Sequence, residues 1–262
     1  VGSGAAGLSC ATYLARLGYQ VTVYERREKA GGLDTYGMAE YKMPQTVSLA
    51  EVEQVKKLGV EFKLNCEIGR DVSFDALRAA HDAVFLAVGL GATNRLNIPG
   101  EDLEGVIDAL HFIEKIKTRD WRSVPLGRTV AVIGAGNTAI DAVTQAKRLG
   151  AERVILIYRR TEKDAPAYDY EMELARKDGV EFMWQSSPVE ILGDGRVAGL
   201  RVADAAGLVT EIACDQVIKA IGQQKMASFF TDIAGVTVDE KGRVLVNDQM
   251  QTSNPKIFSG GD

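Results

Sequence analysis

The sequence predicts an α/β fold made of two domains with parallel sheets. Apolar runs of strand length alternate with stretches of helical spacing along the whole chain. Two glycine-rich turns, at residues 2–7 and 134–139, each precede one helix-like stretch and one strand-like run. The 262 residues suffice for two domains of ordinary size. We therefore expect two Rossmann-like domains, each beginning at one of the turns.

The first part of the chain contains the elements of one such domain. We expect helices at 8–17 and 49–58, and strands at 21–24, 60–64 and 83–88. Gly18 ends the first helix, and the doublet Gly31 and Gly32 lets the backbone approach a ligand closely. The run at 83–88 is apolar throughout, as in a parallel strand buried on both faces. After it, the glycine-rich stretch 89–93 offers an exit from the domain.

A second set of elements begins with a connector and a helix at 109–116. A new unit then follows, with strands at 129–133 and 154–158 around a helix at 138–149, and later strands at 180–184, 197–203 and 216–221. The last stretch has only short strand-like pieces at 236–238, 244–246 and 257–258, too little for a domain. We therefore assign 1–93 and 225–262 to a first domain and 94–224 to a second domain inserted into it.

Both ends of the chain fall inside predicted elements. Only Val1 precedes the first glycine turn, where a nucleotide-binding fold needs a buried strand. The chain stops at Gly260, Gly261 and Asp262, directly after a strand-like run. We expect a fragment of a longer protein, with the first domain truncated at both ends.

Composition narrows the class of protein. A hydrophobic content of 46% and a charged content of 26% are typical of soluble globular proteins. The net charge of −5 and the absence of any apolar run near about 20 residues predict neither a nucleic-acid nor a membrane partner. Cys10, Cys66 and Cys214 form no C-x-x-C pair and no metal-ligand spacing, which fits a cytoplasmic protein without a metal site. His81 and His111 are expected to be structural or surface residues.

The two turns predict different cofactors. A glycine turn before a helix presents free N–H groups and a positive helix end to a pyrophosphate. Glu25 lies 18 residues after Gly7, at a strand tip, where an acid bonds two ribose hydroxyls. Arg159 and Arg160 hold the corresponding place in the second unit, where a guanidinium suits a 2′-phosphate. We therefore expect FAD in the first domain and NADPH, with NADH possible, in the second; packing glycines and a solvated basic pair are the alternatives.

The ordered motifs resemble the FAD/NADPH module shared by dihydropyrimidine dehydrogenase and the small subunit of bacterial glutamate synthase. The marks that carry this resemblance are Glu25, Gly31 and Gly32, the loop 36–44, and the stretches 90–93, 99–101, 132–141, 158–160, 220–222 and 260–262. The resemblance covers essentially the whole chain. Stretches 137–141 and 145–151 look closest to the flavin subunit of bacterial dihydropyrimidine dehydrogenase. The fold implied is that of the pyridine nucleotide-disulfide oxidoreductase type, with the second dinucleotide-binding domain inserted in the first.

The resemblance implies an NAD(P)H-dependent FAD oxidoreductase that serves as an electron-input module. NADPH would pass a hydride to FAD, and iron–sulfur clusters in a missing N-terminal region would relay electrons to an FMN-containing catalytic subunit or domain that reduces pyrimidines. A hetero-oligomer follows from this arrangement. A basic residue that some relatives carry after Arg160 aligns with Pro166, and Lys163 could replace it. The same chemistry could instead feed glutamate formation as a glutamate synthase small subunit, and a nucleotide sensor without turnover is an alternative of another class.

By family position the resemblance also assigns site residues. The FAD contacts would be Gly2, Ser3, Gly4, Ala5, Ala6, Gly7, Glu25, Gly32, Leu33, Lys42, Ile68 and Asp262. The NADPH contacts would be Gly136, Asn137, Thr138, Ala139, Arg159, Arg160, Ala220, Ile221 and Gly222. No catalytic side chain is assigned, because hydride transfer between stacked rings depends on placement more than on acids or bases. Taken singly, Asp262 and Lys42 would be a turn aspartate and a solvated lysine.

Overall fold

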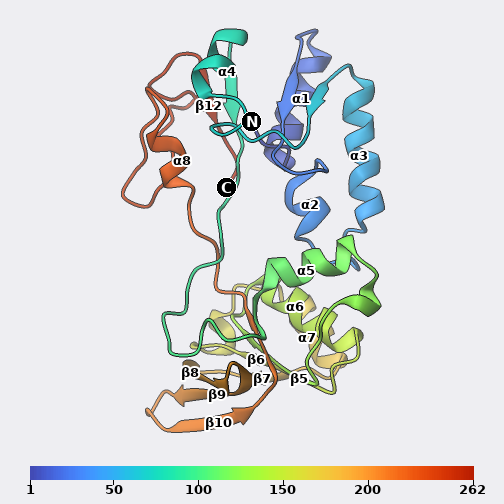
Figure 1. The fold of residues 1–262 in the computed structure, drawn as a ribbon, viewed down its shortest axis with the longest axis vertical. Coiled ribbons are helices and arrows are strands. Elements are labelled where there is room, and N and C mark those ends of the chain that lie inside the picture. The colour runs from blue at the N-terminus through green and yellow to red at the C-terminus, as the bar shows by residue number, and fades with distance from the viewer. The chain divides into compact units, whose positions relative to one another are not determined.

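A computed structural model describes all 262 residues, Val1–Asp262, and divides them into two compact units (Figure 1). Unit 1 contains Val1–Thr35, Met43–Ala92 and Gln223–Asp262, and unit 2 contains Tyr36–Lys42 and Thr93–Gly222. Each unit combines helices with parallel strands, so the predicted α/β class is confirmed. The seven-residue segment Tyr36–Lys42 belongs to unit 2, although the sequence analysis placed it in the first domain.

Unit 1 is built on two parallel strand pairs. Strand β1 (Thr22–Tyr24) pairs with β2 (Glu61–Lys63), and β3 (Val84–Leu86) pairs with β12 (Ile257–Ser259). Val1 connects the pairs, because its amino group donates to the Phe85 carbonyl at 2.7 Å and its own carbonyl accepts from Ala87 at 2.8 Å. The next amide, that of Gly2, donates to the Tyr24 carbonyl at 2.9 Å. The first glycine turn therefore starts between β1 and β3.

Five helices complete unit 1. They are α1 (Ala5–Arg16), α2 (Gly32–Tyr36), whose last residue belongs to unit 2, α3 (Gln45–Lys57), α4 (Phe74–Ala80) and α8 (Ala227–Thr231). Helix α4 is not predicted from the sequence. It begins after Ser73, whose hydroxyl accepts from the Ala76 amide at 3.2 Å, a standard N-cap. The strands expected at 236–238 and 244–246 are reduced to one antiparallel bridge between Val238 and Val244.

Unit 2 contains a five-stranded parallel sheet in the order β4-β11-β5-β6-β7. Its strands are β4 (Val106–Asp108), β5 (Thr129–Ile133), β6 (Arg153–Ile157), β7 (Glu181–Met183) and β11 (Gln216–Lys219). Its helices are α5 (Ala109–Thr118), α6 (Asn137–Arg148) and α7 (Asp169–Lys177), with the 3-10 turns η1 (Trp121–Ser123) and η2 (Glu162–Asp164). Helices expected at 109–116 and 138–149 thus correspond to α5 and α6.

A second sheet of unit 2 corrects the expectation of parallel sheets throughout. Strands β8 (Ser186–Asp194), β9 (Arg196–Asp204) and β10 (Val209–Ala213) form an antiparallel sheet in the order β10-β9-β8. Within this unit, Figure 1 shows α5, α6 and α7 on one side of the parallel sheet and β8–β10 on the other. Gly195, with φ +71°, makes the tight turn between β8 and β9. An apolar run alone does not distinguish a parallel from an antiparallel partner, and for this reason the prediction at 197–203 was incomplete.

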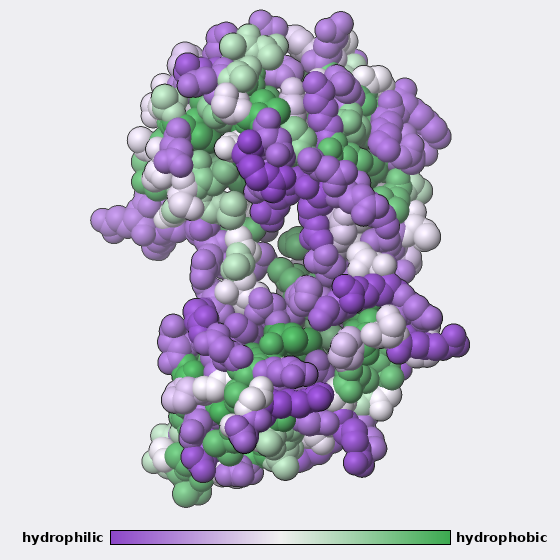
Figure 2. Space-filling view, in the orientation of Figure 1, coloured by the Kyte–Doolittle hydropathy of each residue, from purple (hydrophilic) through white to green (hydrophobic).

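The face of each unit seen in Figure 2 is mostly hydrophilic. On the visible face of each unit, polar and charged residues cover most of the surface and hydrophobic residues form smaller patches between them (Figure 2). This distribution is ordinary for a folded chain, since polar surface never covers a protein completely. No helix combines the length and the apolar character that crossing a membrane requires.

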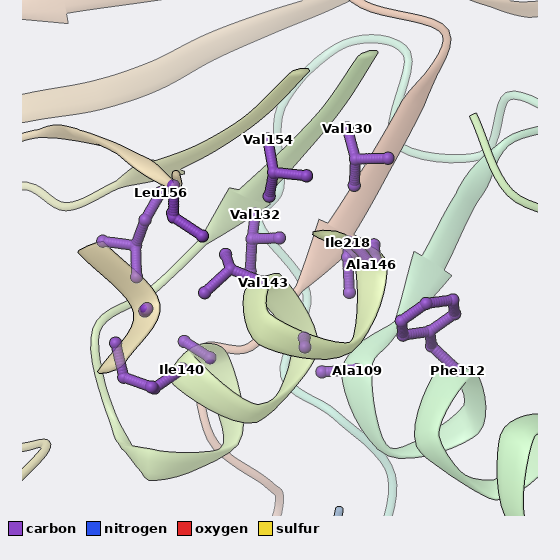
Figure 3. Packing of buried hydrophobic residues seen from close by; sticks show 14 of the residues in the cluster. Ala109, Phe112, Val130, Val132, Ile140, Val143, Ala146, Val154, Leu156 and Ile218 are labelled. Atoms are coloured by element: carbon purple, nitrogen blue, oxygen red, sulfur yellow. The ribbon is translucent and has the colours of Figure 1, made fainter. Parts of the chain in front are cut away.

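Alternating residues of β5 pack into two different cores. Val130 and Val132 are fully buried against Ile140 and Val143 of α6 (Figure 3). Ala131 and Ile133 point the other way, into the core that includes Leu200 of β9. A strand covered on both faces is apolar at every buried position, which is the pattern found at 130–133. The two cores fix the carboxyl ends of β5 and β11, where the second glycine turn lies.

Candidate dinucleotide sites

The first glycines of the two turns have the same geometry. Gly2 has φ +92° and Gly134 has φ +125°, a region that residues with a side chain rarely adopt. A Cβ atom at Gly2 would lie 2.2 Å from the Ala87 carbonyl oxygen, and one at Gly134 would lie 2.2 Å from that of Ala220. Both glycines are therefore required by the protein's own backbone.

The middle glycines, Gly4 and Gly136, differ from the first glycines in backbone conformation and in the space around them. Their φ angles are −69° and −83°, which any residue adopts. A Cβ at Gly4 would have its nearest neighbour at 4.0 Å, and a Cβ at Gly136 would have its nearest at 3.9 Å. Nothing within the protein requires glycine there, whereas a pyrophosphate that approaches the backbone closely does. Both glycines cap helices without a side-chain bond, which leaves the first N–H groups of α1 and α6 available to an anion.

The third positions explain why one turn has glycine and the other alanine. A Cβ at Gly7 would lie 2.1 Å from the Gly2 carbonyl oxygen, so α1 packs too closely for a side chain. Ala139 in α6 is fully buried and its methyl group is accommodated. The remaining predicted residues of the helix starts, Ala5 and Ala6 in α1 and Thr138 in α6, lie in the same first turns. The two turns thus share the features that bind a dinucleotide.

A pocket of about 460 Å³, including open space at its mouth, lies beside the first turn in unit 1. Three of the residues assigned to FAD, Gly2, Glu25 and Ile68, line it together with apolar side chains such as Met226 and Phe229. The fold therefore brings residue 68 to the first turn, which sequence spacing could not show.

Glu25 is held at the end of β1 by the turn itself. It is 7% exposed, and its Oε2 accepts from the Ser3 amide at 3.0 Å and from the Ser3 hydroxyl at 2.6 Å. Its Oε1 accepts from the Arg27 amide at 2.8 Å. A carboxylate can accept further bonds from ligand hydroxyls. Ser3 therefore orients the predicted ribose acceptor.

Two further glycine pairs pack against the start of α1. The Gly31 amide donates to the Ser3 carbonyl at 3.0 Å, and a Cβ at Gly32 would lie 2.6 Å from the Gly4 Cα. A Cβ at Gly261 would lie 2.9 Å from the Cβ of Ala6. Leu33 and Asp262, the neighbours of these glycines, are exposed. All residues assigned to FAD except Lys42 thus belong to unit 1.

In unit 2 the end of β11 lies against the second turn. The Ala220 amide donates to the Ile133 carbonyl at 2.8 Å, and Asn94 fixes the next two residues through their carbonyls. The amide of Asn94 donates to Gly222 at 2.9 Å, and its Nδ2 donates to Ile221 at 3.3 Å. The structure therefore places Ala220 against Gly134, with Ile221 and Gly222 following it in the chain, and their assignment to an NADPH site stays a prediction.

Arg159 and Arg160 directly follow β6 and are exposed. No salt bridge involves either of them, whereas Arg153 on the same strand pairs with Glu181 at 2.7 Å. The chain after them is fixed by a capping box in which the Thr161 hydroxyl donates to Asp164 at 2.6 Å. At this tip of β6, the strand next to β5, neither guanidinium forms a salt bridge, although the charge of Arg160 adds to the Thr161 hydrogen bonds that lower the pKa of the Asp164 carboxyl.

Lys42 lies in a different setting from the other residues assigned to FAD. Its ammonium group is 2.6 Å from an oxygen of Asp141 in α6 and 2.7 Å from one of Glu171 in α7. Both carboxylates are almost completely buried, with side chains 7% and 6% exposed. Neither acid is predicted from the sequence, because a buried acid inside a helix has no distinctive local signal.

Glu101 is a third buried acid that was not predicted from the sequence as a site residue. Its carboxylate accepts from the Leu96 and Asn97 amides at 2.8 and 2.9 Å and from the Lys219 ammonium at 3.0 Å. It anchors the connector that enters unit 2 to the last residue of β11. Ala220 to Gly222 follow Lys219 directly in the chain. The Glu101–Lys219 ion pair therefore holds the strand end from which these predicted NADPH contacts extend.

The cysteines and histidines show no catalytic arrangement. All three cysteines are free, and burial raises the pKa of the Cys214 thiol to about 12. The His81 ring nitrogen lies 3.1 Å from the Tyr24 hydroxyl, a contact inside unit 1. No three His, Cys, Asp or Glu residues are grouped as metal ligands.

Comparisons with known proteins agree with this geometry. The family model for pyridine nucleotide-disulphide oxidoreductases matches residues 1–262. The chain is 37% identical to the small chain of the NADPH-type glutamate synthase of Escherichia coli, with 100% of this chain and 62% of that protein covered. It is 35% identical to the beta subunit of an NADP(+)-dependent formate dehydrogenase of Moorella thermoacetica, with 100% and 40% covered. The chain thus spans less than two thirds of these relatives.

Solved structures support the fold. Thioredoxin reductase of T. acidophilum matches with a TM-score of 0.80 at 22% identity, covering 100% of this chain and 88% of that one. FprA of Mycobacterium tuberculosis in complex with NADPH matches with a TM-score of 0.76 at 21% identity, covering 99% and 77%. At such identities the likeness concerns the fold alone. The family match and the two glycine turns together show that this chain belongs to the pyridine nucleotide-disulphide oxidoreductase family and is a flavin oxidoreductase module.

Proposed function

We propose that the chain is the electron-input module of a larger oxidoreductase, with FAD bound by unit 1 and NADPH bound by unit 2. The observation that carries this proposal is the open space at both Gly4 and Gly136, which no protein contact explains. A scaffold with packing glycines would need them only at the first and third positions. The equal geometry of the two turns favours two dinucleotides over one.

Each unit contributes defined groups. In unit 1 the amides at the start of α1 would hold a pyrophosphate and Glu25 would accept from ribose hydroxyls. In unit 2 the amides at the start of α6 would hold a second pyrophosphate, and Arg159 with Arg160 would hold a 2′-phosphate. When bound, NADPH supplies a hydride and FAD accepts it, and a flavin can release electrons singly. The protein's part is to place the two cofactors and exclude water.

The recipient of the electrons is the finer part of the proposal. The motifs in α6 favour a pyrimidine-reducing, FMN-containing partner reached through iron–sulfur clusters outside these residues. The similarity to glutamate synthase small chains favours a second recipient, an amide-transferring large subunit. Identifying the gene beside this one in the genome distinguishes the two recipients, because a pyrimidine-reducing flavin subunit and a large amidotransferase subunit differ in length and motifs.

The cofactor preference is tested at the strand tip. Replacing Arg159 with alanine is expected to weaken NADPH binding roughly 10- to 100-fold, because a charged hydrogen bond to the 2′-phosphate is lost. NADH has no such phosphate, so its affinity should stay within about 2-fold. The measurement is equilibrium titration of both nucleotides. Arg196→Ala, which removes an exposed arginine of β9, is the control, and equal losses for NADPH and NADH in Arg159→Ala would rule out the assignment.

The function itself is tested by an anaerobic visible spectrum of the full-length protein before and after addition of NADPH or NADH. We expect a flavin band that NADPH bleaches faster than NADH. Bleaching by NADH alone would keep the flavin and overturn the choice of nucleotide. A full-length protein without a flavin band, even after incubation with FAD, would reject the module and favour a nucleotide sensor.

A further inference from the structure

A buried ion cluster connects the two helices that border the predicted NADPH site. The Lys42 ammonium lies between Asp141 of α6 and Glu171 of α7, at 2.6 and 2.7 Å. The Tyr41 hydroxyl donates to the same Asp141 oxygen at 2.9 Å. Lys42 itself is 22% exposed, so most of the cluster is shielded from water. One cation thus serves two acids on two helices.

The cluster lies about one helical turn behind the glycine turn. Asp141 is the fifth residue of α6, which begins at Asn137, and Glu171 is the third residue of α7, which begins at Asp169. The same two helix starts are also joined by the Asn137 side chain, whose Oδ1 accepts from the Tyr168 amide at 3.1 Å. This bond and Lys42 therefore join α6 and α7 near the site, in addition to the apolar packing of Met172 and Ala175 in the core that contains Ile140.

The segment that contains Lys42 is not part of the strand–turn–helix elements that form the nucleotide-binding fold of unit 2. Residues Tyr36–Lys42 precede the β4–β11 sheet by more than fifty positions in the chain, yet they pack in unit 2. The Glu40 amide donates to Oε1 of Gln145 at 3.0 Å, and the Arg148 guanidinium lies 4.6 Å from the centre of the Tyr41 ring. Both partners are residues of α6, so the segment is fixed along that helix and delivers Lys42 to its first turns.

The charge of Lys42 is essential to this arrangement. Burial alone would lower the pKa of Lys42, but the hydrogen bonds to Asp141 and Glu171 outweigh burial and raise it, so the side chain stays charged. Without that charge, the two nearly buried carboxylates would keep only hydroxyl donors, Tyr41 for Asp141 and Tyr170 for Glu171. Like charges in such a setting repel and attract water, and α6 and α7 would move apart.

We infer that Lys42 is a positioning residue of the NADPH site, which holds the starts of α6 and α7 at the spacing that the dinucleotide needs. This inference rests on the proposed function. It gives Lys42 a role in nucleotide binding, where the resemblance implied a contact with FAD. Small displacements of binding groups cost much affinity, so the role is measurable at equilibrium.

The test is the affinity of the full-length protein for NADP⁺, measured by calorimetry together with the FAD content. Lys42→Met is expected to weaken NADP⁺ binding at least about 10-fold while the FAD content stays at the wild-type level. Lys42→Arg should remain within about 3-fold, because it keeps the charge. The triple variant Lys42→Met/Asp141→Asn/Glu171→Gln removes all three charges and should recover most of the affinity. Lys177→Met, which removes an exposed lysine from the other end of α7, is the matched control.

The outcomes separate the possible roles. Wild-type affinity in a folded Lys42→Met protein would overturn the inference, and loss of FAD with intact NADP⁺ binding would return Lys42 to the flavin site. If the wild-type protein itself binds no NADP⁺, the proposed function fails and the inference falls with it, whereas a loss confined to Lys42→Met concerns the inference alone. Should Lys42→Met not fold, Lys42→Gln, which removes the charge and keeps a hydrogen-bond donor, takes its place with the same expected split between NADP⁺ and FAD.

Discussion

Replacing Gly134 with alanine is expected to lower the free energy of unfolding of unit 2 by roughly 2–4 kcal/mol. Gly134 has φ +125°, and an added Cβ would lie 2.2 Å from the Ala220 carbonyl oxygen. Both the backbone strain and the clash fall on β5 and β11, the central strands of the parallel sheet. The measurement is urea unfolding followed by circular dichroism, compared with the wild-type protein.

Gly136→Ala is the matched control, because it adds the same methyl group two residues later. Its φ of −83° is ordinary and its nearest neighbour would be 3.9 Å away, so we expect a loss below about 1 kcal/mol, as for alanine at a helix N-cap. Its NADP⁺ affinity should nevertheless fall at least about 10-fold, because the methyl group occupies the space of a pyrophosphate oxygen. Unfolding free energies that are equal for the two variants would contradict this reading of the turn.

Replacing Lys219 with methionine should destabilise unit 2 by roughly 2–4 kcal/mol, because it leaves the buried Glu101 carboxylate without its ammonium partner. The Glu101 side chain is 2% exposed and the pair distance is 3.0 Å. The Arg95 guanidinium lies 3.5 Å from the Glu101 carboxylate, but it compensates only in part for the lost ammonium, because the Arg95 side chain is half exposed. Unfolding in urea at pH 7 is the measurement, with Lys163→Met as a control that removes an exposed lysine of η2.

This effect should depend on pH in a defined direction. Burial alone would raise the pKa of Glu101, but the Leu96 and Asn97 amides and the Lys219 ammonium outweigh it and lower that pKa. A lowered pKa means that the stabilisation is fully present above the unfolded value of about 4.3 and disappears as the pH falls through the folded value. The difference between wild type and Lys219→Met should therefore shrink below about pH 4. A difference that stays constant from pH 7 to pH 3 would assign the loss to packing instead of charge.

Local chemistry explains what sequence reasoning predicted well. Strand β5 (Thr129–Ile133) has the predicted bounds, and α6 (Asn137–Arg148) begins and ends within one residue of the helix predicted at 138–149. A buried strand and a capped amphipathic helix both have strong local signals. Helices α4 (Phe74–Ala80) and α7 (Asp169–Lys177) were missed. They are short and expose much charge, so their apolar spacing is weak.

The amino-acid sequence by itself determined the α/β class, the two glycine turns and the charged residues at the ends of β1 and β6. These features depend on neighbours within one strand–turn–helix unit, and glycine at a positive φ is dictated locally. Only the tertiary structure decided that Ile68 lines the pocket beside Glu25, that β8–β10 pair antiparallel, and that Lys42 meets Asp141 and Glu171. The contacts of Ile68 and Lys42 join residues about 40 to 130 positions apart in the printed sequence. Which distant residues meet depends on how the cores pack, and a local sequence pattern contains no information about that packing.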